Sequence, residues 1–447
     1  MDVLKERCEK NYGGAGMIPL IVFLGLYIGA GIIFSIQGLE KPFGILDRNA
    51  PLLIGLLVAL LIFDRKESIA RKTQLFCAYA GQSSPMQLTL ILLLSGGFTN
   101  LAAEIGGKES VANLAISLIP TSFMVPAIFV LAAVMSTCIG TSNGTLAAIL
   151  PIGVAMCQGT GVNMAIVGAA VICGAYFGDN LSLISDTTIV ATQSVGAQMK
   201  DKFRMNLAMS LPAGIMATIA FYIASRGSIN GSSLAEAGAY NLMTILPYLA
   251  VLVMAIAGLD IILVMTLGIV LAAVIGMVNG TALIDCMNAV STGMSNMMTY
   301  CIFAMLIAAL VGFVRYYGGI DWLMGKLTKL VKGKRSCEYI CCILPMVLSA
   351  IIAHGTMAIM ISGPLVKEMG DRHGIEPKRM AGLMDIGGCL GVTFIPHASG
   401  MLLAIGATGA EYFDIVPYLY YTMFLLVAVV IVVQFRLLTT KKKEQAA

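Results

Sequence analysis

Long apolar stretches recur along the chain from Met17 to Arg436, and short polar or charged segments separate them. Many of these stretches approach the roughly 20 apolar residues that an α-helix needs to cross the hydrocarbon core of a bilayer. The first one, Met17 to Ile36, is longer than the apolar core of a signal peptide, so we expect it to be a retained span. The pattern therefore predicts an all-α polytopic membrane protein.

Four of the apolar stretches are interrupted by glycine together with hydroxyl, amide or imidazole side chains. The interruptions read GTSNGT, GDNLSLISDTT, HGT and GGCLGVTFIPHASG in chain order. Because Ser, Asn and Asp compete for backbone hydrogen bonds, these strings favour helix breaks at membrane depth. The predicted elements are re-entrant hairpins at about 111–157 and 338–367, and broken helices at about 163–197 and 379–407.

Lysine and arginine gather in a few loops, which the positive-inside rule places in the cytoplasm. With a hairpin in each half returning to its own side, five crossings remain in each half. Five is odd, so the halves 1–225 and 226–447 are predicted to be inverted-topology repeats, with about ten transmembrane helices in total and both termini cytoplasmic. Glycines at matching places support the repeat, since Gly174 and Gly387 each open a broken element. The basic loops are 64–73, 200–204, 326–335, 367–379 and the C-terminal end.

Composition narrows the class further. The chain has 447 residues, of which 58% are hydrophobic and 12% charged, whereas soluble domains have about 25% charged residues. The net charge of +4 comes without a basic stripe interleaved with aromatic residues, which excludes a nucleic-acid surface. The 11 cysteines are scattered and show no CxxC spacing, so we interpret them as buried small hydrophobic residues. The sequence calls for no cofactor, and its surroundings are the lipid bilayer.

The polar residues of the first two breaks predict a cation site. An aspartate near the bilayer centre costs at least about 2.5 kcal/mol on insertion scales, and Asp179 and Asp186 incur this cost twice within eight residues. Carboxylate, hydroxyl and amide oxygens suit Na⁺ or H⁺ better than soft metals. One carboxylate can hold either a proton or a sodium ion, which is the competition that an antiporter needs. The expected neutral ligands are Thr141, Ser142, Asn143, Thr145, Asn180, Ser182, Ser185, Thr187 and Thr188.

Other interpretations of these residues stay open from sequence. Asp186, standing before Thr-Thr-Ile-Val, also suits the N-cap of a half-helix. Residues 140–144 match the G-x-S-x-G pattern of serine hydrolases, with His354 or His397 as the base of an intramembrane protease, although the preceding segment is an apolar helix and not a strand. The breaks in the second half could form a further binding site or a proton relay. The alternative is that their histidines are buried imidazoles whose hydrogen bonds only stabilise the structure. The residues of this further site or relay are His354, Thr356, Asp385, Thr393, His397 and Ser399.

The strings GTSNGTLAAILPI at 140–152 and GDNLSLISDTT at 178–188 resemble the NhaC-type sodium/proton antiporter family, within an ion-transporter group that includes dicarboxylate and citrate carriers. The similarity is strong over about residues 135–195 and extends as a general layout over nearly the whole chain. This chain departs from the family pattern at Asn143, where the family has tryptophan, at Leu183, where it has proline, and at His397, where proline is usually followed by tryptophan.

The resemblance implies a secondary transporter that exports Na⁺ in exchange for protons across the cytoplasmic membrane. The alternative is Na⁺- or H⁺-coupled movement of a small organic acid or amino acid through the same site. Two acidic groups would allow more than one proton per sodium ion. The assembly considered for the chain is a homodimer.

Overall fold

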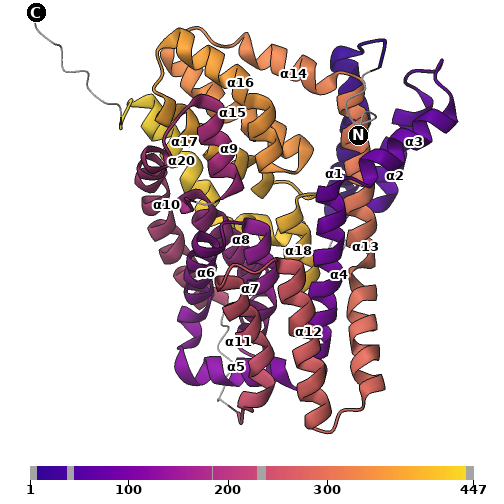
Figure 1. Ribbon diagram of the computed structural model, residues 1–447, viewed down its shortest axis with the longest axis vertical. Helices are drawn as coiled ribbons and strands as arrows, with labels where there is room; N and C mark the ends of the chain where they lie inside the picture. The colour runs from indigo at the N-terminus through magenta and orange to yellow at the C-terminus, as the bar shows by residue number, and fades with distance from the viewer. Residues whose placement is uncertain (1–7, 38–44, 184, 229–237, 439–447) are drawn as a thin grey trace, which may run out of the picture.

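The computed structural model describes residues 8–37, 45–183, 185–228 and 238–438, and the described chain is helical throughout (Figure 1). The first ten α-helices are α1 Ile18–Ile36, α2 Asn49–Leu61, α3 Ile69–Ala80, α4 Ser83–Glu104, α5 Gly107–Leu118, α6 Thr121–Ile139, α7 Ser142–Cys157, α8 Met164–Leu181, α9 Asp186–Val195 and α10 Met199–Ser228. The others are α11 Leu242–Ile256, α12 Ile261–Val278, α13 Leu283–Tyr316, α14 Gly319–Thr328, α15 Lys334–Ile352, α16 Gly355–His373, α17 Pro377–Thr393, α18 Ser399–Thr408, α19 Tyr412–Ile415 and α20 Tyr420–Gln434.

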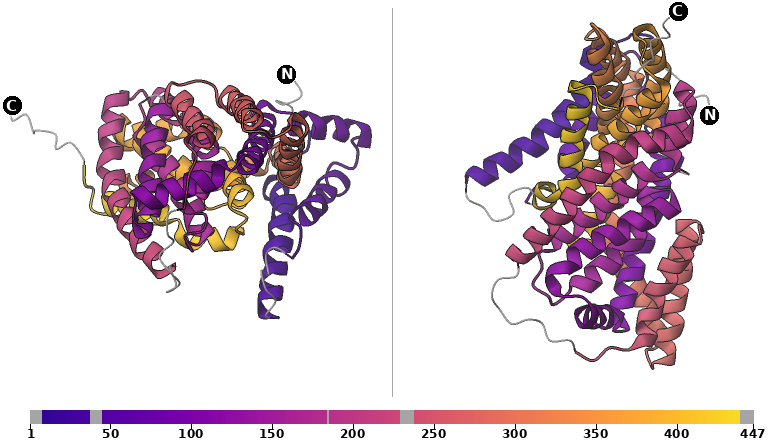
Figure 2. Two further views of the ribbon diagram at one scale, coloured as in Figure 1. Left: turned by 90° about the horizontal axis from the view of Figure 1, so that it is seen from below. Right: turned by 90° about the vertical axis from the view of Figure 1, so that its left-hand side faces the viewer.

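The predicted class, an all-α protein with many membrane spans, is confirmed. Within the described ranges, eight helices are long and apolar enough to cross a membrane, and a ninth is obtained if the bent pair Tyr412–Tyr418 and Tyr420–Gln434 is one span. Shorter apolar helices accompany them, among them α7 and α18. The total of ten crossings remains a prediction. Figure 2 shows α1 standing out from the side of the bundle, where Ile21, Ile32 and Ile33 are exposed, as expected for a surface that faces lipid.

Each break in the helices has a local cause in the sequence. Gly140 ends α6 with a φ of 74°, a left-handed conformation that glycine adopts without steric cost. The next residue, Thr141, caps α7 by accepting a hydrogen bond from the Gly144 N–H. In the second half, Ala353 has a φ of 58° after α15, and His354 caps α16. The chain therefore turns sharply between two helices at Gly140–Thr141 and again at Ala353–His354.

The helices of the two halves recur with one spacing. The helices α6, α7, α8 and α9 begin at residues 121, 142, 164 and 186, and α15, α16, α17 and α18 begin at 334, 355, 377 and 399. Each start in the second set lies 213 positions after its counterpart. The same run of four helices, with the same two break points, therefore occurs twice in the chain.

Close helix packing repeats at the same spacing. A Cβ added to Gly178 of α8 would lie 2.2 Å from the carbonyl oxygen of Ala133 in α6. A Cβ added to Gly391 of α17 would lie 2.0 Å from the carbonyl oxygen of Met346 in α15. Both partners of the second contact lie 213 positions after those of the first. Glycine is needed at both crossings because any side chain would collide with backbone.

The remaining helices form a wall beside this repeated core. The helices α4 and α13 lie side by side, and a Cβ on Gly96 would be 2.4 Å from the Gly293 carbonyl oxygen. The helices α1, α2, α3 and α12 pack around this pair (Figure 1). The breaks of the repeated core face this wall, so polar groups released at the helix ends meet between the two parts.

Candidate functional site

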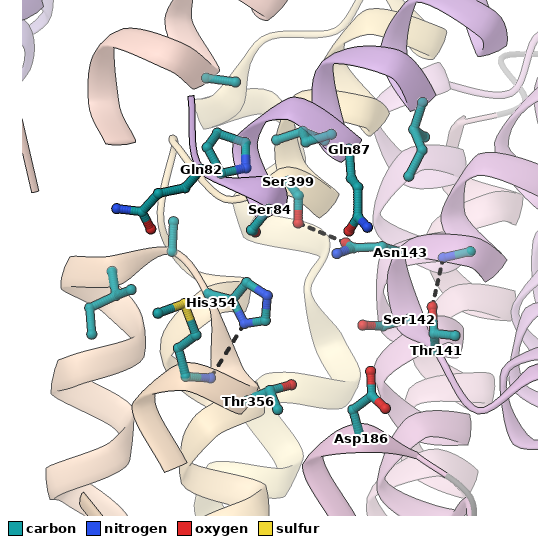
Figure 3. A pocket seen from close by; sticks show the side chains of 18 of the residues that line it. Gln82, Ser84, Gln87, Thr141, Ser142, Asn143, Asp186, His354, Thr356 and Ser399 are labelled. Atoms are coloured by element: carbon teal, nitrogen blue, oxygen red, sulfur yellow. Dashed lines mark hydrogen bonds between the residues drawn. The ribbon is translucent and has the colours of Figure 1, made fainter. Parts of the chain in front are cut away.

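A cavity of about 490 Å³ lies where the helix breaks face α4, α12 and α13 (Figure 3). Its lining brings together residues of all four breaks that the sequence singled out. The predicted site residues on the cavity wall are Thr141, Ser142, Asn143, Asp179, Ser185, Asp186, Thr187, His354, Thr356, His397 and Ser399. Residues more than 200 positions apart therefore line one polar chamber.

Asp179 is the most buried acidic group of this chamber, with 3% of its surface exposed. It lies in the last turn of α8, and the chain folds back after the break so that two hydroxyls reach its carboxylate. The Ser185 Oγ donates to Oδ1 at 2.7 Å, and the Thr187 Oγ1 donates to Oδ2 at 3.3 Å. The two hydroxyls lie 2.8 Å from each other. One carboxylate and two hydroxyls thus form a compact group of hard oxygen ligands.

Asp186 lies in a different environment from Asp179. Its side chain is exposed and lines the cavity from the first turn of α9. The residue at the N-cap of α9 is Ser185 and not Asp186, and the Ser185 side chain bonds to Asp179 instead of to the helix backbone. The positive end of the α9 dipole stabilises the Asp186 carboxylate. This carboxylate adds negative charge at the wall of the chamber.

The turn between α6 and α7 contributes neutral oxygens. Figure 3 shows Thr141 and Ser142 on the same side of the cavity as Asp186. The Thr141 hydroxyl accepts from the Gly144 N–H at 3.0 Å, so part of its bonding capacity caps α7. Asn143 Oδ1 accepts from the Ser399 Oγ at 2.7 Å, which ties the first break to the start of α18.

The two histidines of the second half both line the cavity, by different means. His354 Nδ1 accepts from the Met357 N–H at 3.4 Å, so this imidazole caps α16. His397 is 3% exposed, and neither of its ring nitrogens has a hydrogen-bond partner among the described residues. His397 therefore brings buried polar atoms to the cavity wall, whereas His354 bonds to the backbone of α16.

Six predicted site residues lie away from the cavity and bond elsewhere. Thr145 donates to the Thr141 carbonyl and Thr393 to the Cys389 carbonyl, as hydroxyls within helices commonly do. Ser182 donates to the Thr137 carbonyl at 3.2 Å. The others, Asn180, Thr188 and Asp385, meet in a separate buried cluster.

That buried cluster is centred on Lys202, which sequence reasoning placed in a cytoplasmic loop. The assignment to a loop was wrong: α10 begins at Met199, and Lys202 is fully buried with its Nζ 2.6 Å from Asp385 Oδ2. Asn206 Nδ2 donates to the same carboxylate oxygen at 2.7 Å. Asp385 thus pairs with a lysine and not with either histidine. A polar stripe at i, i+4 and i+8 (Lys202, Asn206, Ser210) was the sequence signal for this buried face.

Almost all buried charged side chains among the described residues have a hydrogen-bonding or ion-pair partner. Lys202 pairs with Asp385, and Arg379 pairs with Glu338 at 2.8 Å. Lys72 donates to the carbonyl oxygens of Leu60 and Phe63. Asp179 is then the one buried carboxylate without a cationic partner in the described part of the chain. Since an unpaired buried charge is costly, this carboxyl group is stable in its buried position only when a proton or another cation neutralises it.

Arg315 is a further residue that the sequence analysis missed. It lies at the end of α13 and lines the cavity. In the sequence, Arg315 stands at the edge of an apolar run, next to Tyr316 and Tyr317, so the hydropathy pattern does not mark it as part of a site. The chamber therefore has both acidic and basic side chains in its wall.

Broken helices whose ends meet at a polar chamber inside an apolar bundle define a secondary transporter. The model of the Na⁺/H⁺ antiporter family matches residues 14–226 and 174–439, so the chain belongs to that family. It is a secondary Na⁺/H⁺ antiporter, not an enzyme, and the protease hypothesis for Ser142 is not retained.

The chain is similar to individual proteins over different shares of its length. The Na⁺/H⁺ antiporter NhaC of Bacillus subtilis is 23% identical over 76% of this chain and 82% of that protein. The malate-2H⁺/Na⁺-lactate antiporter of Bacillus subtilis is 25% identical, but the match spans 46% of this chain and less than half, 43%, of that protein. The YdaH transporter of Alcanivorax borkumensis aligns with 94% of this chain and 99% of its own at 14% identity, with a TM-score of 0.41.

Proposed function

We propose that this antiporter exchanges Na⁺ and H⁺ at the carboxylate of Asp179, and that it exports Na⁺ in exchange for protons entering across the cytoplasmic membrane. The observation that carries the proposal is the absence of a cationic partner for Asp179 among the described residues, while the other buried carboxylates are paired. The proton and the sodium ion neutralise this carboxylate by turns.

The surroundings of Asp179 supply ligands for a dehydrated sodium ion. The Ser185 hydroxyl contacts one oxygen of the Asp179 carboxylate, and the Thr187 hydroxyl contacts the other. Each hydroxyl can turn its lone pairs toward a cation. Ser142 and Thr141 face the same chamber from the α6–α7 turn. Asp186, at the exposed wall, attracts cations into the chamber by its charge and can contact the entering ion.

The repeat supports a transport cycle in which the chamber opens to each side in turn. We propose that residues 1–225 and 226–447 are inverted repeats, supported by the 213-residue spacing of four helix starts and of the glycine crossings. The basic loops favour cytoplasmic termini. In such transporters, rocking of one part against the other exposes a fixed site alternately to the two faces of the membrane.

A second candidate function is exchange of a small carboxylate or amino acid together with the cation. Two observations favour it: the cavity of about 490 Å³ is far larger than one sodium ion needs, and Arg315 in its wall suits a carboxylate. A relative is named a malate-2H⁺/Na⁺-lactate antiporter.

The test of the function uses the purified full-length protein in proteoliposomes that contain a fluorescent pH indicator. We expect Na⁺ added outside to drive protons out of the vesicles, and K⁺ at the same concentration to have no such effect. Malate, lactate, arginine and buffer are then added in turn, each with and without Na⁺. Proton movement that requires both Na⁺ and an organic solute would support the second candidate.

Asp179→Asn serves as the matched control for the site, because it keeps the shape of the side chain and removes its charge. We expect the variant to remain folded in detergent and to lose Na⁺-dependent proton movement. Unchanged exchange by Asp179→Asn would refute the proposed site even if the wild type proves to be a Na⁺/H⁺ antiporter.

A further inference from the structure

The Lys202 ammonium group fills a pocket of oxygens that is separate from the cavity lining. Its Nζ lies 2.6 Å from Asp385 Oδ2 and 3.2 Å from the Asn180 carbonyl oxygen. It also donates to Thr188 Oγ1 at 2.5 Å, so all three of its N–H bonds have an oxygen acceptor. A carboxylate, a hydroxyl and a carbonyl at the C-terminal end of a half-helix are the groups that also bind Na⁺ in transporters.

The oxygen pocket around Lys202, which we call the second cation site, has no opening to the cavity in the structure. Lys202 and Asp385 are each 0% exposed, and neither lines the cavity. Cys389 lies between the two carboxylates. It stands one helical turn after Asp385 on α17, and the Cys389 Sγ lies 3.8 Å from Asp179 Oδ2. The two carboxylates are therefore near neighbours with different partners.

The pair occurs once, although the helices that hold it occur twice. The positions 213 residues from Lys202 and Asp385 are Ile415 and Ile172, both apolar. Lys202 comes from α10 in the first half and Asp385 from α17 in the second half. The ion pair thus links the halves and is not part of the repeated framework.

We propose that Lys202 is a tethered counter-cation that occupies the seat at Asp385, so that Asp385 takes no part in exchange and the buried site exchanges one positive charge per cycle. This rests on the proposed function of Asp179. With Asp385 neutralised by the protein itself, one buried carboxylate is left to alternate between H⁺ and Na⁺. Exchange at this buried site is then one proton for one sodium ion, and it is electroneutral.

The first experiment measures the charge moved. Wild-type proteoliposomes are given a fixed Na⁺ gradient, and the pH gradient at which net proton flux stops is determined with and without a potassium diffusion potential set by valinomycin. We expect the stopping pH gradient to be the same at both potentials. A stopping point that moves with the potential shows net charge transfer and overturns the proposal, and this can happen while Asp179→Asn is inactive and the proposed function stands.

The second experiment separates a counter-cation from a proton relay by rescue. Asp385→Leu leaves the ammonium of Lys202 buried near Asp179 without its carboxylate partner, so we expect the apparent Na⁺ affinity to fall by at least about tenfold. In the double variant Lys202→Met with Asp385→Leu, both charges are gone, and we expect the affinity to return to within about threefold of wild type. Lys200→Met, on the exposed start of the same helix, is the control for a lysine change without effect.

A folded double variant that binds Na⁺ but exchanges no protons would show that the Lys202–Asp385 pair is needed for proton movement, and would overturn the proposal. If Asp385→Leu alone fails to fold, the double variant and the voltage measurement still decide. Retained, voltage-independent exchange by the double variant supports the proposal in that case.

Discussion

The broken helix α8–α9 and its counterpart α17–α18 have the same backbone plan and different chemistry. Their helices start 213 positions apart, and each crosses its neighbour through a glycine. At the same spacing, Asp179 corresponds to Val392, and Ser185 corresponds to Ala398. At these equivalent positions, the carboxylate and the hydroxyl that bonds to it are therefore present only in the first half.

The repeated backbone supplies the helix ends around the cavity, whereas the cation site also requires a carboxylate that only the first half provides. The repeat brings four helix ends to one chamber and leaves their polar groups available. The cation seat then needs a carboxylate at only one of these ends. The second half supplies neutral groups instead, such as Ser399, which bonds to Asn143, and His397.

Replacing the two equivalent residues should give the largest contrast. Asp179→Asn should lower the initial rate of Na⁺-dependent proton movement by at least about 100-fold, because removing a group that contacts the transported ion removes the seat itself. Val392→Thr, similar in volume and at the equivalent position, should stay within about threefold of wild type. Comparable losses in both variants would mean that the halves contribute equally and that the contrast is false.

Substitution of the glycine at either helix crossing should lower the stability by a similar amount, because both crossings belong to the repeated backbone arrangement. Gly178→Ala and Gly391→Ala each place a methyl group against backbone and should destabilise the protein by about 2 kcal/mol or more. Gly29→Ala in α1, where no atom lies within 4 Å of the added carbon, is the matched control. Thermal unfolding in detergent measures all three, and a large shift for only one of the two crossings would argue against a common plan.

Removal of the two hydroxyls that bond to Asp179 should have the next largest effect. Ser185→Ala and Thr187→Val each remove a hydrogen bond to a charged group, which is worth about 1.5–3 kcal/mol, or roughly ten- to hundredfold in affinity. We expect this loss in the apparent affinity for Na⁺ with the protein still folded. Ala398→Ser, which adds a hydroxyl at the counterpart of Ser185, should leave the Na⁺ affinity unchanged; a gain there would reveal a second seat.

The contact between the halves should have the smallest effect. Ser399→Ala removes the bond to Asn143 Oδ1. A neutral hydrogen bond contributes about 0.5–1.5 kcal/mol, so we expect a change of about two- to tenfold in the Na⁺ concentration at half-maximal exchange. Inactivation by Ser399→Ala as complete as that by Asp179→Asn would place an essential ligand in the second half.

The class of the protein and its family were predictable from the sequence, since both depend on local features. Apolar runs of spanning length identify a membrane protein, and the string at 178–188 carries the family likeness. The cavity-facing hydroxyls were predicted only as a group. Ser182 and Ser185 look alike in the sequence, yet Ser182 bonds to the Thr137 carbonyl, while Ser185 follows the break and reaches Asp179.

Long-range partners could not be predicted, because they depend on how distant helices pack. Lys202 looks like one of three basic residues in a loop until α17 places Asp385 against it, 183 positions along the chain. Arg315 likewise gains its position in the cavity wall from the packing of α13. Both residues lie at the ends of apolar runs, where the hydropathy pattern does not distinguish a loop from a buried helix end.

Proton release on Na⁺ binding tests most directly whether both ions use one carboxylate. The purified protein is placed in weakly buffered detergent solution below neutral pH, and NaCl is added while a pH indicator is recorded, with choline chloride as the control. We predict that Na⁺ displaces about one proton per chain from the wild type and none from Asp179→Asn. Equal release from both proteins, or Na⁺ binding to the wild type without release, would contradict the account.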